Sequence, residues 1–108
     1  MMIRPDCGTA SANPNPIALP GCSTVCVVVL CVGDTDLEAR YTLTGTVTFD
    51  DGSKAAGPFP VHCAGGACNV CRLLCFKGGG VQSFPVDICV KDTASGIEMC
   101  CTVNIQVR

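Results

Sequence analysis

The chain has 108 residues, a formal net charge of −2 and only 15% charged side chains. This length is enough for one domain with its own core and too short for two. The sequence has no basic cluster of the kind that holds nucleic acid, and its longest apolar run is far too short to cross a bilayer. We therefore expect no nucleic acid among its partners and no membrane insertion.

Eleven cysteines dominate the composition. Thiols at this density are used either in disulfides or as metal ligands. Because the number is odd, at least one thiol is free, bound to metal or paired with another chain. The first residues lack the apolar segment of a secretion signal, which contrasts with the oxidising compartment that disulfides require.

Residues 1–22 have the composition of an extended N-terminal connector arm. The segment from Ala10 to Pro16 is rich in proline and asparagine, which favour extended backbone and remove hydrogen-bond donors. Cys7 lies within this arm and Cys22 at its base. We expect the arm to dock on a neighbouring copy of the chain and to bond to it through Cys7.

Residues 23–108 are expected to form one all-β domain. The β-branched run Cys22–Val32 predicts a strand that is buried on both faces. Apolar and polar residues alternate over Ala39–Phe49, which predicts a half-buried strand, with Gly45 marking a bulge or a close backbone approach. The segment Lys54–Cys63 is broken by glycine and proline and predicts an edge strand or a loop.

Three further segments complete the pattern. Cys68–Phe76 favours a strand, and Val81–Lys91 alternates, with Pro85 placing it towards the edge of a sheet. The last segment, Ile97–Arg108, has apolar residues at its odd positions and mainly polar residues at its even positions. Six to eight short strands without a helix predict an antiparallel β-sandwich or jelly roll with an extended N-terminal arm.

Cys100 and Cys101 are adjacent in the last segment. Neighbouring side chains of a strand point to opposite faces, so Cys100 faces solvent if Cys101 faces the core. A solvent-facing thiol is available to another molecule. We therefore expect Cys7, Cys22 and Cys100 to form intermolecular disulfides. The other cysteines are candidates for disulfides within the chain: Cys26, Cys31, Cys63, Cys68, Cys71, Cys75, Cys89 and Cys101.

A metal site is the alternative use of the densest cysteine cluster. The spacing Cys63-x4-Cys68-x2-Cys71 resembles the loop of plant-type [2Fe–2S] ferredoxins, with Cys101 at the place of a distant fourth ligand. The helix that ferredoxins place before this loop has no room here. Four neighbouring thiolates also suit zinc. The alternative is thus a small metalloprotein with iron–sulfur or zinc held among Cys63, Cys68, Cys71, Cys75 and Cys101. If these cysteines form disulfides instead, the segment needs no cofactor.

No pattern in the sequence indicates an enzyme. His62 precedes Cys63, but adjacent strand side chains diverge and do not form a nucleophilic pair. Asp34 with Asp36, and Asp50 with Asp51, could suggest calcium, but calcium needs six to eight oxygen ligands, and turn chemistry explains these residues better. We expect neither catalysis nor a resident cofactor.

In layout the chain resembles the subunits of bacterial endospore appendages, with Cys7 in an N-terminal arm followed by cysteine-flanked strands. The resemblance implies a connector that precedes a jelly-roll sandwich and bonds to neighbouring subunits along an extracellular fibre. Such subunits are made without a signal peptide. By position, Cys7 would be the connector thiol, and the acceptor candidates would be Cys22, Cys26, Cys31 and Cys100.

The sequence therefore predicts a structural subunit of a disulfide-cross-linked extracellular filament or appendage. Its partners would be copies of itself, and its location would be outside the cell or on a cell or spore surface. A monomeric, disulfide-stabilised binding module is a further alternative.

Overall fold

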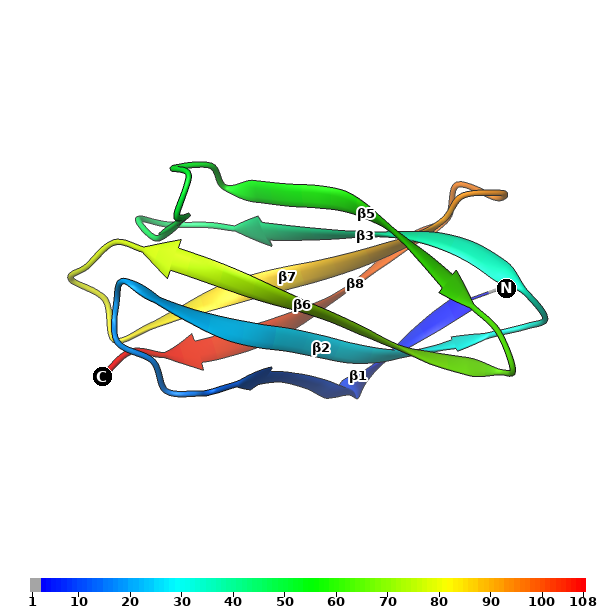
Figure 1. Cartoon of the computed structure of the whole chain (residues 1–108), viewed down its shortest axis with the longest axis horizontal. Coiled ribbons are helices and arrows are strands. Elements are labelled where there is room, and N and C mark those ends of the chain that lie inside the picture. The colour runs from blue at the N-terminus through cyan, green and yellow to red at the C-terminus, as the bar shows by residue number, and fades with distance from the viewer. Residues whose placement is uncertain (1–2) are drawn as a thin grey trace.

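The computed structural model describes residues 3–108, which form two four-stranded β-sheets packed face to face (Figure 1). No helix occurs among these residues. The antiparallel all-β sandwich expected from the sequence is confirmed. The eight strands are β1 (Ile3–Asn13), β2 (Gly21–Cys31), β3 (Thr35–Leu43), β4 (Thr48–Phe49), β5 (Ala55–Cys63), β6 (Ala67–Lys77), β7 (Ser83–Asp92) and β8 (Glu98–Gln106).

The eight strands belong to two sheets, and the chain passes back and forth between them. One sheet, called the β2 sheet here, has the order β1-β2-β6-β4, and the other, the β3 sheet, has the order β5-β3-β7-β8. Ile17, in the connection after β1, forms a parallel bridge to Val107 beyond β8. The sequence left sandwich and jelly roll open, and the structure is a sandwich of two four-stranded antiparallel sheets.

The core lies between the sheets and is mainly aliphatic. Alternate residues of β2 are fully buried, as are alternate residues of β7, because successive strand side chains point to opposite faces. At one end three aromatic rings join the sheets: Phe76 lies 5.7 Å from Phe49 and 5.0 Å from Phe84, measured between ring centroids. Phe76 is only 1% exposed and is therefore enclosed by other residues of the core.

The strand β8 shows the alternation expected from its sequence. Cys101, Val103 and Ile105 are buried, whereas the even positions are exposed. Cys100 is on the solvent face and Cys101 in the core, as predicted from their adjacency.

The N-terminal segment differs from the expected connector arm that docks on a neighbouring copy. From Ile3 onward, residues of the predicted 1–22 arm belong to the sandwich, and β1 pairs with β2 along its length, with an irregularity between Asp6 and Ser11. Two apolar side chains explain this, because Ile3 is 2% and Ile17 is 3% exposed in the core. The proline-rich composition fits an edge strand and the connection after it.

Two strands are arranged differently from the prediction. The alternating segment Ala39–Phe49 is divided between β3 and β4, which lie in different sheets, and the chain crosses over near Gly45, whose φ is 83°. β7 is a central strand rather than an edge strand. Pro85 is tolerated there because the pairing with β3 begins only at Val86.

Replacing Phe76 by alanine should remove the ring that joins the two sheets. We expect Phe76→Ala to lower the free energy of unfolding by about 3–5 kcal/mol. Leu73→Ala on the same strand is the matched control, because Leu73 is 64% exposed, and it should change the value by no more than about 0.5 kcal/mol. Guanidinium chloride denaturation of the oxidised proteins measures both, and equal effects would contradict this account of the core.

Candidate functional site

Five disulfides are the dominant chemical feature of the structure. Two of them join the two sheets: Cys7–Cys101 links β1 to β8, and Cys31–Cys63 links β2 to β5. The other three join neighbouring strands within a sheet, namely Cys22–Cys75 and Cys26–Cys71 between β2 and β6, and Cys89–Cys100 between β7 and β8. Disulfides at this density indicate an oxidising environment, extracellular or secreted.

The three disulfides within sheets follow directly from strand register. Cys22 is the antiparallel partner of Cys75, Cys26 of Cys71, and Cys89 of Cys100. Side chains at directly opposed positions lie on the same face and within bonding reach. All three bonds lie on the outer faces of their sheets, where their cysteines are exposed or half-buried.

The structure differs from the expectation that Cys7, Cys22 and Cys100 bond to other copies, because each is paired within the chain. Cys100 does face outward, but Cys89, directly opposite on β7, faces outward too and is its disulfide partner. Seven of the eight cysteines assigned to intramolecular disulfides lie in such bonds, and the exception is Cys68. The sequence offered no register, and therefore no way to see these opposed pairs.

The cysteines of the alternative metal site do not converge. Cys63, Cys71, Cys75 and Cys101 belong to four different disulfides, and only Cys68 is a thiol. On β6, Cys68 lies on the core-facing side, whereas Cys71 and Cys75 lie on the outer face. A disulfide sulfur is not a thiolate ligand, so this arrangement does not fit an iron–sulfur cluster or zinc.

Cys68 is half-buried on β6, directly opposite Val29 of β2. Burial raises the pKa of its thiol. The thiolate is the nucleophilic form of cysteine, so Cys68 is poorly suited to rapid reaction with other molecules.

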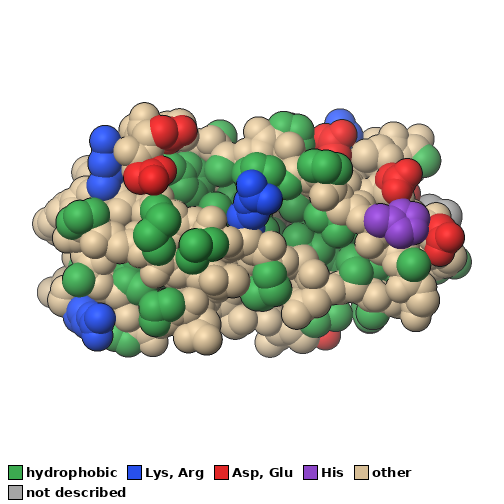
Figure 2. Space-filling view, in the orientation of Figure 1, with side chains coloured by type: hydrophobic (Ala, Val, Ile, Leu, Met, Phe, Trp, Pro, Cys, Tyr) green, Lys and Arg blue, Asp and Glu red, His purple; other side chains and the backbone are tan. Residues whose placement is uncertain are grey.

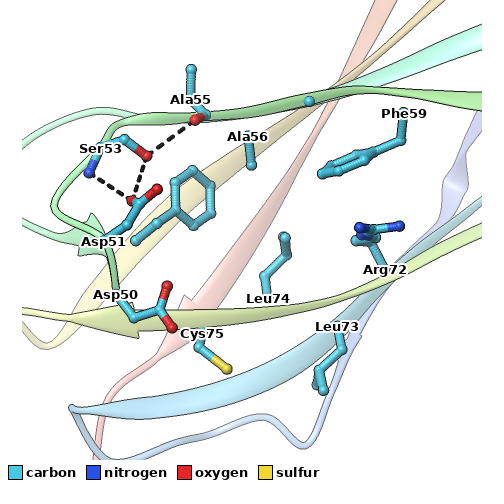
Figure 3. A pocket seen from close by; sticks show the side chains of 12 residues that line it. Asp50, Asp51, Ser53, Ala55, Ala56, Phe59, Arg72, Leu73, Leu74 and Cys75 are labelled. Atoms are coloured by element: carbon cyan, nitrogen blue, oxygen red, sulfur yellow. Dashed lines mark hydrogen bonds between the residues drawn. The ribbon is translucent and has the colours of Figure 1, made fainter.

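A groove opens where the two sheets part, between β5 and β6. Figure 2 shows hydrophobic side chains in a hollow along this face, and the hollow includes a cavity of about 380 Å³. The guanidinium of Arg72 lies 3.7 Å from the ring centroid of Phe59 across it (Figure 3), a favourable cation–π contact. Beyond the short β4 pairing at Phe76 and Lys77 and the hydrogen bond from the Asp50 N–H to the Cys75 carbonyl, this edge of β6 has no strand partner among residues 3–108.

The end of the groove is acidic. Asp50 and Asp51 lie there, and the Asp51 carboxylate accepts hydrogen bonds from the hydroxyl and the backbone N–H of Ser53, at 2.6 and 2.9 Å (Figure 3). The hydroxyl bond from Ser53 is the main reason that the pKa of Asp51 is lowered.

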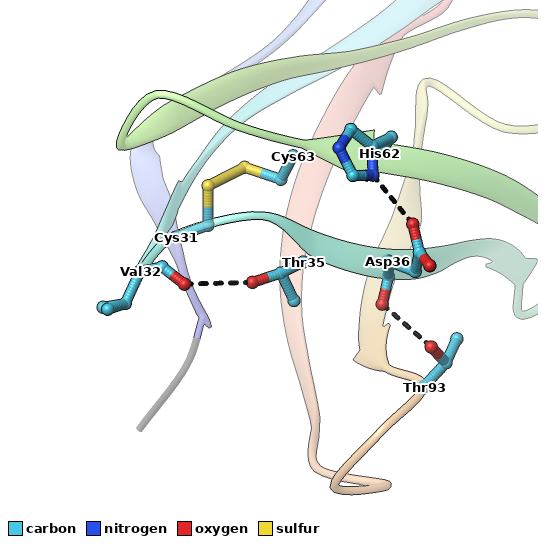
Figure 4. Close-up of polar contacts among 7 residues, drawn as sticks. All are labelled: Cys31, Val32, Thr35, Asp36, His62, Cys63 and Thr93. Atoms are coloured by element: carbon cyan, nitrogen blue, oxygen red, sulfur yellow. Dashed lines mark hydrogen bonds and ion pairs between the residues drawn. A yellow bond between two sulfur atoms is a disulfide. The ribbon is translucent and has the colours of Figure 1, made fainter.

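His62 interacts with Asp36 rather than with a cysteine. Its Nδ1 lies 2.8 Å from Asp36 Oδ1, while Cys63 turns to its disulfide with Cys31 (Figure 4). Both charged side chains are exposed. The hydrogen bond to Asp36 raises the pKa of His62, so the pair is a surface ion pair below that pKa.

Comparisons with known proteins identify the fold and no family. No protein-family model matches the chain, and no curated protein matches it. Among solved structures, the crystal structure of a FixG-related protein from Vibrio parahaemolyticus superimposes with a TM-score of 0.69, covering 100% of this chain and 98% of that one. The sequence identity is 8%, so the likeness shows a shared sandwich alone. None of the described residues forms a helix able to cross a bilayer.

The sulfur assignment predicts a simple mass experiment. Counted per chain, the native protein should be lighter than the reduced protein by two hydrogens for each of the five disulfides. Iodoacetamide should add once to the oxidised, unfolded chain, at Cys68, and much more slowly to the folded chain because the thiol is half-buried with a raised pKa. Labelling at any other cysteine would contradict these pairings.

The Asp36 contact predicts the titration of His62. Asp36→Asn should bring the pKa of His62 down towards its usual value, whereas Asp34→Asn should lower it less, because Asp34 makes the smaller contribution. The sign follows from the raised pKa: the imidazolium that pairs with Asp36 is present below the pKa of His62 and is lost as pH rises through it. An NMR pH titration of the imidazole measures both variants, and equal shifts would contradict the dominance of Asp36.

Proposed function

We propose that this chain is a structural subunit of a disulfide-cross-linked extracellular filament or appendage assembled from copies of itself. The observation that carries the proposal is the attachment of β1. It is an edge strand, it carries Cys7 of the inter-sheet bond to Cys101, and a proline-rich connection joins it to β2. Such a strand can make the same contacts with its own domain or with a neighbour.

Exchange of β1 gives this assembly a defined contact. The β1 of one copy pairs with β2 of the next, and Cys7 bonds to Cys101 of that copy in place of its own. The exchanged contacts reproduce those within the chain, which is why strand swapping has a low thermodynamic cost. Because the contact is head-to-tail, it generates a ring or an open filament.

The remaining disulfides suit each subunit to a durable assembly. The other four bonds stay inside the subunit, and each contributes roughly 2–4 kcal/mol of stability in small domains. The surface is poorly charged and exposes Val32, Leu73 and Ile97, which favours lateral packing between copies. The proposal assigns no catalytic step, in keeping with a histidine held by Asp36 and a neighbouring cysteine held in a disulfide.

A denaturing gel without reductant tests the covalent exchange. Natively purified protein should give a ladder of multiples of the 11.1 kDa chain, and reductant should collapse it to one band. Replacing both Cys7 and Cys101 by serine should abolish the ladder. Cys68→Ser is the matched control, because it removes the one free thiol and should leave the ladder intact.

The reverse outcome would overturn the exchange. If the ladder persists without Cys7 and Cys101 and disappears in Cys68→Ser, the copies are joined through the free thiol instead. If the native protein runs only as a monomer without reductant, the copies are not joined by disulfides and the proposed covalent filament is wrong.

The groove between β5 and β6 favours a second candidate, a monomeric, disulfide-stabilised binding module. The unpaired edge of β6 next to an apolar hollow suits an extended peptide that adds as a strand. This candidate predicts a monomer by light scattering, together with loss of peptide binding when Phe59 of the groove is replaced by aspartate.

A further inference from the structure

Three of the four sheet edges are protected against the addition of another strand. β5 carries Pro58 and Pro60, which lack the backbone N–H that an added strand would bond. The edge of β8 is covered by the connection after β1. There the Asn15 side chain donates to the Asn104 carbonyl at 3.2 Å and accepts from the Gln106 N–H at 2.8 Å. The third edge, β1, is interrupted by the irregularity in its middle.

The fourth edge, along β6, is open. β4 pairs with only the last two residues of β6, and the Asp50 N–H donates to the Cys75 carbonyl at 3.0 Å. In an antiparallel strand the N–H and C=O of one residue point to the same side, and this side alternates from residue to residue. Cys71 and Leu73 therefore present their N–H and C=O groups to the same edge as Cys75, where no strand among residues 3–108 pairs with them.

Arg72 lies between these two residues and is unusual for its position. It is on the core-facing side of β6, where Val70 and Leu74 are buried, yet it is exposed because the two sheets part here. Its guanidinium lies 3.7 Å from the ring centroid of Phe59, which holds it over the groove (Figure 3). In the part of the chain that the structure describes, no carboxylate forms an ion pair with it.

Tyr41 does not supply the missing negative charge. Its ring centroid lies 6.2 Å from that of Phe59, and burial raises the pKa of its hydroxyl, so the phenol stays neutral. Stacking on Phe59 uses a face of the guanidinium, whereas the N–H donors lie in its plane. Arg72 is thus held in place with donors free for a carboxylate, which limits the entropy lost on binding.

We propose that this edge binds an extended segment of a partner protein, which adds to β6 as a strand and places a carboxylate against Arg72. The main chain of the segment would pair with the N–H and C=O groups of Cys71 and Leu73. A side chain directly opposite Arg72 lies on the same face of the sheet, about 5 Å away between Cβ atoms. A glutamate or aspartate there can accept two hydrogen bonds from the guanidinium.

The charges of the groove favour one carboxylate rather than a run of acidic residues. Asp50 and Asp51 lie at the end of the groove next to Cys75, and they would repel further acidic side chains on that side. The bound segment therefore carries neutral or basic residues towards this end of the groove.

This inference rests on the second candidate function, the binding module, and gives the chemistry of its partner. It is also compatible with the filament. The order β1-β2-β6-β4 places β1 and the open edge of β6 on opposite sides of the β2 sheet, so exchange of β1 between copies would leave the groove free.

The test is fluorescence anisotropy of labelled peptides titrated with the oxidised, full-length chain at low salt. The peptides have about eight residues, within the usual range of strand lengths. They alternate valine with threonine and carry glutamate, glutamine or lysine at one central valine position. The glutamate peptide should bind about fivefold more tightly than the glutamine peptide, and the lysine peptide should bind most weakly. Added salt should reduce this preference.

Substitutions in the chain separate the carboxylate contact from the strand pairing. Arg72→Gln should bind the glutamate and glutamine peptides equally. Arg40→Gln is the matched control and should keep the preference for glutamate, because Arg40 is an exposed arginine of β3 outside the groove. Leu73→Pro should abolish binding of all three peptides, because proline removes an N–H that faces the open edge and not β2. If Leu73→Pro does not fold, a backbone N-methylated glutamate peptide, which should not bind the parent, replaces it.

Three outcomes would overturn the proposal in different ways. Equal binding of the three peptides to the parent would exclude the carboxylate contact and leave the binding module standing. Absence of binding by every peptide up to about 1 millimolar would exclude both. If light scattering shows a dimer that Leu73→Pro dissociates, a second copy of the chain occupies the edge instead.

Discussion

Two sulfur–sulfur bonds between facing sheets are the constraint on which this fold depends. The core of a chain this short is small and mainly aliphatic, and such a core alone gives marginal stability. Cys7–Cys101 and Cys31–Cys63 fix the spacing of the two layers, one through the N-terminal edge strand and the other through β5. Because both sheets are held in place, the same molecule can leave a groove open between β5 and β6 without losing its architecture.

The strand pattern of the chain could be predicted because it depends on local alternation. In β8 the apolar odd positions are the core-facing ones, and the opposite directions of Cys100 and Cys101 follow from a single geometric rule. The all-β sandwich follows from the same rule applied along the chain. Ala39–Phe49 shows its limit: the alternation continues through the segment, although the chain crosses between sheets near Gly45. Period-two alternation predicts which side chains of a strand face the core, but it does not predict to which sheet the strand belongs.

Features that depend on contacts between residues far apart in the chain could not be predicted from the sequence alone. Cys22 and Cys100 have the exposure expected of cysteines available to other copies, yet each has a cysteine directly opposite on the neighbouring strand. Ile3 and Ile17 convert an arm into a strand by adding two apolar side chains to the core. Arg72 is an ordinary charged residue in the sequence until the fold places it at a core-facing position beside an unpaired sheet edge. Each case needs strand register, which a single sequence does not contain.

The bond between Cys7 and Cys101 also determines how the chain would respond to mechanical tension. The start of β1 and the segment after β8 lie at opposite ends of the long axis (Figure 1), and the bond spans a sequence separation of 94. A pulling force applied at the two ends would pass from β1 directly through this bond into β8. Only the short segments outside it could then extend, and every strand from β2 to β7 would be shielded from the load. The sandwich would behave as a stiff link whose breaking force is set by a covalent bond rather than by hydrogen bonds.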